Sequence, residues 1–162
     1  MIQQKVFKTL FVGILVSVIM AGCGERYVKG TQIKFSPEKQ EIADLVEQYR
    51  LAVEQRDVDA LRTMASLKYY ENASTTTDPT DDYDYNGLEK VLAELKNTVK
   101  TVKYSVKIKE IDIIGEAARV DYEYESQYLL ALGDQDRWAT RTDKNRLLFT
   151  REDGEWKIRS GM

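Results

Sequence analysis

The sequence predicts an α+β fold in which three N-terminal helices pack against a curved antiparallel sheet. In three stretches, residues 42–53, 58–65 and 88–99, apolar side chains recur every three or four positions, which is the period of a helix with one buried face. Between residues 102 and 160, apolar and polar side chains alternate, which is the period of half-buried strands. The helical patterns all precede the long strand patterns, and this order indicates an α+β architecture rather than alternating parallel units.

The helix boundaries follow from capping residues. Ser36–Glu38 supplies an N-cap serine, a proline at the first helical position and an acid in the first turn, so a helix should begin there and end near Arg56. Asp57 is the expected N-cap of a second, shorter helix, and Asn86 that of a third, as part of a capping box. The apolar stripes of these helices are Ile42, Leu45, Val46, Tyr49, Ala52 and Val53; Val58, Leu61, Met64 and Ala65; and Leu88, Val91, Leu92, Leu95 and Val99.

Four strands should form an antiparallel meander. The predicted strands span residues 102–113, 118–128, 138–151 and 155–160. Near Glu110 the alternation slips by one residue, and a β-bulge there would keep both halves of the strand buried. Asp153-Gly154 is the strongest hairpin signal, because this dipeptide favours a type I′ turn between paired strands.

The N-terminus resembles the signal sequence of a bacterial lipoprotein. Residues 1–22 carry Lys5 and Lys8, then an apolar run over residues 10–19, then small residues directly before Cys23. Met20-Ala21-Gly22-Cys23 resembles a lipobox, although its first residue departs from the usual leucine. The resemblance implies cleavage after residue 22 and lipidation of Cys23, the only cysteine of the chain.

Lipidation would place the protein in the cell envelope and make the membrane its first partner. Gly24 follows the cysteine, where aspartate signals inner-membrane retention in enterobacterial lipoproteins. The resemblance therefore implies the periplasmic face of the outer membrane. Residues 23–36 lack helical or strand periodicity and are expected to form a flexible tether, with the folded domain spanning residues 37–162.

The order of the predicted elements is similar to that of the nuclear transport factor two-like superfamily, also called cystatin-like or ketosteroid-isomerase-like. Two helices, a short strand near Lys68–Glu71, a third helix and a meander of long strands follow one another. Tyr49–Leu61 resembles the family's helix, acidic turn and second helix, and Asp153–Arg159 resembles its last hairpin. The resemblance implies a cone-shaped α+β barrel whose interior is the pocket, and family members include isomerases, dehydratases and hydrolases.

Composition excludes several functional classes. The net charge is −3 with interleaved signs, whereas nucleic-acid binders need an excess of positive charge. The chain has no histidine, which removes the commonest general base and metal ligand. An acid-rich loop lacks the glycine and terminal glutamate of an EF-hand loop, so no metal and no cofactor are expected. Its acids are Asp78, Asp81, Asp82 and Asp84.

Aromatic residues are the candidate lining of the cone. Tyr69, Tyr104, Tyr122, Tyr124 and Trp138 are expected to point inward, where they either line a pocket or fill the core. The acids of the second long strand have the opposite parity, so they should face outward beside lysines of the neighbouring strand. These acids are Asp121, Glu123 and Glu125. A stripe of arginines on the third strand, interleaved with acids, is expected to be a salt-bridged edge.

Three hypotheses follow for function. The first is a non-catalytic binding module for a partner protein or a small apolar ligand at the membrane surface, as a monomer or homodimer. The second is an isomerase- or hydrolase-type enzyme, which would require Asp112, Asp121 or Glu123 inside the cone within reach of a tyrosine hydroxyl, because one slip of register exchanges the two faces of a strand. The third is an accessory subunit of an envelope assembly.

Overall fold

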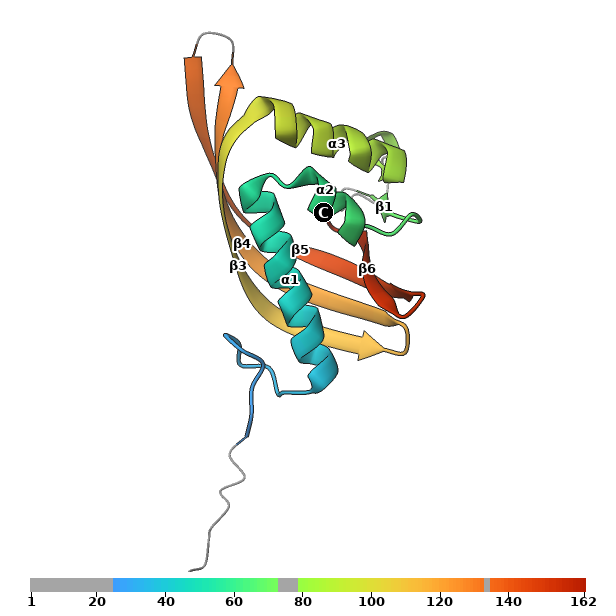
Figure 1. The fold of residues 1–162 in the computed structure, drawn as a ribbon. Helices are drawn as coiled ribbons and strands as arrows, with labels where there is room; N and C mark the ends of the chain where they lie inside the picture. The colour runs from blue at the N-terminus through green and yellow to red at the C-terminus, as the bar shows by residue number, and fades with distance from the viewer. Residues whose placement is uncertain (1–24, 73–78, 133–134) are drawn as a thin grey trace, which may run out of the picture.

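The computed structural model describes residues 25–72, 79–132 and 135–162, so the signal sequence, Cys23 and Asp78 lie outside the described residues. Three helices and a four-stranded sheet form the domain (Figure 1). The helices are α1 (Pro37–Gln55), α2 (Val58–Met64) and α3 (Tyr85–Thr98). The long strands are β3 (Val99–Ile114), β4 (Ala117–Leu132), β5 (Gln135–Glu152) and β6 (Glu155–Ser160). The short strands β1 (Tyr70–Glu71) and β2 (Tyr83–Asp84) pair with each other, and a 3-10 turn spans Pro79–Asp81.

The main sheet is an antiparallel meander of order β3-β4-β5-β6, curved around the helices as Figure 1 shows. The α+β architecture predicted above is confirmed. The predicted bulge is present as a register shift between Ile108 and Glu110, and it keeps Ile111 buried. Asp153 and Gly154 both have positive φ, 51° and 85°, as a type I′ turn between β5 and β6 requires.

The helices begin at capping residues. Ser36 accepts a hydrogen bond from the Lys39 N–H at 3.1 Å, and Asp57 accepts one from the Ala60 N–H at 3.0 Å, as predicted. The third helix starts earlier than expected, because Asp84 rather than Asn86 is its cap. The aspartate carboxylate is a full charge at the positive end of the helix dipole, whereas an asparagine amide is neutral.

The segment expected to be a flexible tether is ordered over residues 26–35, so that expectation was wrong for this part. It forms a small hairpin in which the Val28 N–H donates to the Ile33 carbonyl and the Phe35 N–H to the Arg26 carbonyl, both at 2.9 Å. Val28 is 1% exposed and belongs to the core. Val28 is the buried anchor of this hairpin, and Ile33 packs partly against the core beside it. So short an apolar pattern has no period from which burial can be predicted.

Side chains of α1 hold the free edge of β3. The Arg50 guanidinium donates to the Tyr104 carbonyl at 3.0 Å, and a Glu54 carboxylate oxygen accepts from the Tyr104 N–H at 3.4 Å. Arg56, the residue that caps the C-terminus of α1, donates to the Val99 carbonyl in the same way. These contacts satisfy backbone groups that an edge strand would otherwise expose, and they fix α1 across the concave face.

The described residues contain no helix that is long and apolar enough to cross a membrane.

Candidate binding site

Three of the predicted pocket tyrosines are part of the packed core. Tyr69, Tyr104 and Tyr122 are all buried. The Tyr104 ring contacts Tyr49 edge-on, with centroids 6.2 Å apart, and it lies 5.7 Å from the Tyr124 ring. Offset and edge-on ring contacts of this kind are typical of a filled aromatic core. The rings of these tyrosines therefore fill the core of the cone.

The buried hydroxyls form a short polar chain. The hydroxyls of Tyr104 and Tyr122 lie 3.5 Å apart, and the Asn145 amide donates to the Tyr122 hydroxyl at 3.2 Å. Burial raises the pKa of both tyrosines above the ordinary value of a tyrosine hydroxyl, because a phenolate there would lose its hydration. Both tyrosines are neutral at physiological pH and contribute a hydrogen-bonded pair of hydroxyls to the core.

Trp138 does not point into the cone, and its predicted inward placement was wrong. It lies on the projecting part of β5 opposite Leu129, and it is 51% exposed. The Lys103 ammonium lies 5.8 Å from its ring centroid. On β5 the odd-numbered residues, such as Leu147 and Phe149, face the core. Trp138 is even-numbered and therefore faces outward.

Tyr124 borders a polar pocket of about 430 Å³ on the concave face. Arg141, Asp143 and Asn145 of β5 line it together with Glu71. Sequence reasoning missed these three β5 residues, although alternation counted back from Leu147 places all of them on the concave face. The Arg141 guanidinium donates to Asp143 at 2.8 Å and lowers the pKa of that carboxyl, so Asp143 is ionised at neutral pH.

The final residues partly close this polar pocket. The Gly161 N–H donates to Glu71 at 2.6 Å, and the Met162 N–H donates to the Tyr69 hydroxyl at 3.0 Å. Asn145 also donates to the Gly161 carbonyl at 3.2 Å. Tyr69 thus serves as an acceptor for this segment, and the polar groups near it already have partners.

The acids of β4 face outward, as predicted. Asp121 pairs with Arg146 at 2.6 Å, and Glu123 pairs with Lys109 at 2.7 Å on the convex side. Asp112 is held by Arg119 of the neighbouring strand. The Lys109 ammonium lowers the pKa of Glu123, as an ion pair on a solvated surface does. The hydrogen-bond partners of these three acids are therefore cations of the convex face and not tyrosine hydroxyls.

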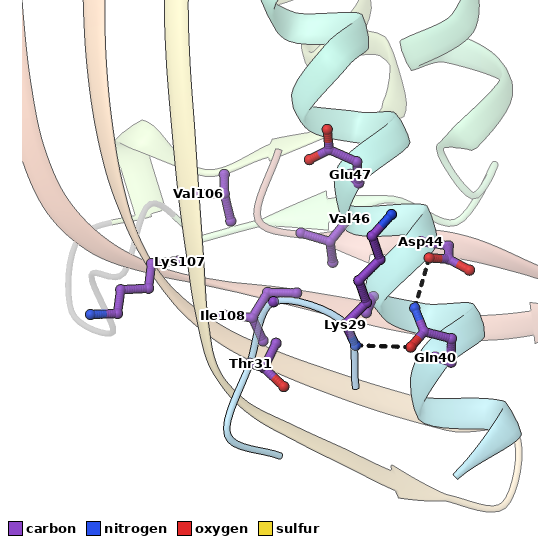
Figure 2. Close-up of a pocket in the computed structure, with 11 residues that line it drawn as sticks. Lys29, Thr31, Gln40, Asp44, Val46, Glu47, Val106, Lys107 and Ile108 are labelled. Carbon is purple, nitrogen blue, oxygen red and sulfur yellow. Dashed lines mark hydrogen bonds between the residues drawn. The ribbon is translucent and has the colours of Figure 1, made fainter. Parts of the chain in front are cut away.

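A second cavity, a groove of about 360 Å³, lies between the N-terminal hairpin, α1 and β3 (Figure 2). We call it the hairpin groove. Its floor is apolar, and Figure 2 shows Val106 and Ile108 of β3 on the side of Val46 of α1, while Lys107 points away. The residues that line it are Lys29, Gly30, Thr31, Gln40, Ala43, Asp44, Val46, Glu47, Val106, Lys107 and Ile108.

Hydrogen bonds hold the walls of the hairpin groove in place. The Lys29 N–H donates to the Gln40 side-chain carbonyl at 3.0 Å, and the Gln40 amide donates to Asp44 at 2.9 Å (Figure 2). Thr31 donates to the Val28 carbonyl at 3.0 Å inside the turn, where Gly30 has a φ of 77°. The hairpin wall is thus connected to α1 through one glutamine and through the burial of Val28.

The rim of the hairpin groove carries fixed charge. Arg50 donates two hydrogen bonds of 2.8 Å to the Glu47 carboxylate and lowers its pKa, and the nearby Lys29 contributes in the same direction. Glu47 is therefore ionised at neutral pH. Apolar residues of α1 and β3 next to charged side chains are the lining expected of a site for an amphiphilic molecule.

Sequence reasoning missed this groove because one of its walls was assigned to the tether. The stripe on α1 and the alternation on β3 identify Val46, Val106 and Ile108 as inward residues. Nothing in the sequence shows that the N-terminal segment folds into a hairpin that packs beside these residues. The described residues hold no cluster of three or more acidic, cysteine or histidine side chains that could bind a metal ion.

Comparison with known proteins shows the fold. The chain matches no protein-family model and no curated protein. A conserved protein from Planctomyces limnophilus superposes with a TM-score of 0.64 at 14% identity, covering 76% of this chain and 92% of that one. An NTF2-like superfamily protein from Salmonella enterica gives 0.61 at 13% identity (76% and 87%), and a ketosteroid isomerase-like protein from Erwinia carotovora gives 0.63 at 16% identity (78% and 95%).

These structures share one architecture, the NTF2-like cone, with this chain. Their names include a nuclear transport factor 2-like protein and a ketosteroid isomerase-like protein, and a shared fold of this kind is compatible with several functions. The function has to be argued from the cavities of this chain.

Proposed function

We propose that this chain is a lipid-anchored envelope protein whose domain is a non-catalytic binding module, with the hairpin groove as its ligand site. The anchor is Cys23, and the proposed location is the periplasmic face of the outer membrane. The ligand is a small molecule with an apolar body, which the groove floor buries. The observation that carries the proposal is the apolar, rim-charged hairpin groove itself.

Size and chemistry support this assignment. A volume of about 360 Å³ lies at the lower end of the range of small-molecule sites, about 300–1,000 Å³. Val106 and Ile108 are only partly buried, although they face the helix, so an apolar ligand would remove further apolar surface from water. The groove also adjoins the first described residues, which lie close to Cys23 in the chain. A lipid-anchored domain would therefore carry this site at its membrane-proximal end.

Filling the groove tests the proposal. The neutral fluorescent probe N-phenyl-1-naphthylamine should bind the full-length protein, and Val106→Trp should weaken binding about tenfold or more, because the indole occupies the floor. Ile114→Trp is the matched control, since it adds the same ring to the exposed end of β3 outside the groove. Equal affinity in both variants, or no binding to the wild type, would contradict the proposed site.

The anchor is tested separately. Intact-mass analysis of membrane-extracted protein should show a diacylglyceryl adduct, and Cys23→Ser should abolish both the adduct and membrane retention. Retention of the acyl mass by this variant would refute lipidation at Cys23.

A hydrolase- or isomerase-type enzyme is the second candidate, and the concave polar pocket is the observation that favours it. Arg141 and Asp143 lie there beside Tyr124, so an acid does face the concave side. The lowered pKa makes Asp143 a weak base, and both ions of this pair are largely exposed. Turnover of a steroid enone or an epoxide that is abolished by Asp143→Asn would establish the enzyme and displace the binding module.

A further inference from the structure

The N-terminal part of β5, before the residues that pair with β6, is an open edge of the sheet. β6 pairs with β5 only from Leu148 to Glu152, and within the described residues no strand lies beside Asp136–Arg146 on that side. The Arg141 carbonyl accepts from Ser126 of β4, so odd-numbered residues turn their backbone groups toward β4. The even-numbered residues from 136 to 144 therefore direct their N–H and C=O groups to the open edge, and the Arg146 carbonyl beyond them is covered by Gly161.

The opposite edge of the sheet, on β3, is held by side chains at Val99 and Tyr104. Side chains of α1 hydrogen-bond to the Tyr104 backbone on β3, as described above. On the open edge of β5, local side chains accept from two backbone groups: the Lys144 N–H donates to Asp143 and the Arg146 N–H donates to Asn145, both at 2.8 Å. Gly161 lies against the Arg146 carbonyl, so the open stretch ends before Arg146. The hairpin of β4 and β5 also projects past α3, so this edge is accessible to another chain (Figure 1).

We propose that the open edge of β5 pairs antiparallel with β5 of a second copy of this chain. With the two-fold axis at Thr140, the residue numbers of each opposite pair add up to 280. Even-numbered residues therefore lie opposite even-numbered residues, as the directions of their backbone N–H and C=O groups require. In this register Asp136 lies opposite Lys144 of the partner copy, and Arg137 lies opposite its Asp143. Each pairing occurs twice, so the strand is complementary to itself in charge.

Charge selects this register over its neighbours. An axis at Ala139 would place Arg137 opposite Arg141 of the second copy, and an axis at Arg141 would place that arginine opposite itself. Like charges directly opposite destabilise a strand pair, whereas opposite charges stabilise it. An axis at Thr142 forms only the Arg141–Asp143 pairings and shortens the overlap toward β6. The proposed register also lays the exposed Trp138 ring over Thr142 of the partner copy.

The existing ion pairs can rearrange at low cost. Lys100 donates to Asp136 at 2.6 Å, and Arg141 donates to Asp143 at 2.8 Å. All four side chains are more than 40% exposed, and exposed pairs contribute little to stability. An interface of two nine-residue strands is small, so we expect a transient dimer that a membrane-bound population would favour.

Cysteine crosslinking in membranes tests the register. Thr140→Cys places two thiols opposite each other at a Cα separation of about 5.5 Å, within the range of a disulfide. Thr142→Cys is the matched control, because its two copies would lie about 14 Å apart along the strands. Full-length Thr140→Cys should give a disulfide-linked dimer under mild oxidation, whereas Thr142→Cys and the wild type, whose single cysteine is Cys23, should not.

Charge reversal in the Thr140→Cys background tests the pairing. Asp136→Lys and Lys144→Asp should each lower the dimer yield about fivefold or more, and the double reversal should restore it. Absence of a Thr140→Cys dimer, an equal or higher yield from Thr142→Cys, a crosslink to a different protein, or single reversals without effect would each overturn the proposal.

Discussion

Truncating Val28 to alanine should loosen the N-terminal hairpin while leaving the rest of the domain folded. Val28 is the fully buried side chain of this segment, so Val28→Ala removes two methyl groups from the core. At about 0.8 kcal/mol for each buried carbon, the hairpin loses about 1.6 kcal/mol of docking free energy. That loss corresponds to an equilibrium for local opening about 15-fold more favourable.

Amide hydrogen exchange followed by NMR measures this opening. The Phe35 N–H is the reporter, because it donates to the Arg26 carbonyl only while the hairpin is closed. Its exchange should accelerate about 15-fold in Val28→Ala, while the amide of Val120, in the centre of the sheet, should change far less. Val91→Ala, which truncates an exposed valine of α3, is the matched control. Equal protection of Phe35 in Val28→Ala and the wild type would refute the docked hairpin.

Three further outcomes are expected. Arg50→Met should lower the free energy of unfolding by about 1–2 kcal/mol in chemical denaturation, because it breaks the link between α1 and the Tyr104 carbonyl. The same arginine lowers the pKa of Glu47 and Glu54, so the stability that these ion pairs contribute is present above about pH 4.5 and is lost as the pH falls through the lowered pKa values. Acid unfolding from pH 5 to 3 should therefore be steeper in the wild type than in Arg50→Met. Identical profiles would contradict this expectation. Burial raises the pKa of Tyr104 and Tyr122, so their contribution to folding stability is full below about pH 10 and is lost as the pH rises above it. In an alkaline titration, tyrosinate absorbance should show that these two residues ionise only when the protein unfolds.

The fold was predictable because its signals are local and periodic. The stripe on α1, the alternation in β3 and β4 and the Asp153-Gly154 turn each determine one element, and all of them agree with the same architecture. Even the bulge beside Glu110 follows from a slip in alternation. The Asn86 cap was wrong because Asp84 competes for the same helix start two residues earlier.

The site was less predictable, because it depends on which layers meet. The inward parity of Arg141, Asp143 and Asn145 could have been counted back from Leu147, but their charge suggested an outward face. A polar concave face is possible here because, among the described residues, no helix contributes to the lining of the concave pocket. The burial of Val28 depends on a contact across the chain, for which the isolated sequence of the hairpin holds no signal.

The position of the ligand on the domain tests the account most directly. Titration of N-phenyl-1-naphthylamine into the isotope-labelled full-length protein, followed by amide chemical shifts, locates the occupied cavity. The largest shifts are expected at Val46, Val106 and Ile108, in the hairpin groove. Shifts centred on Tyr124 and Asp143 in the concave pocket, or no saturable shifts, would contradict it.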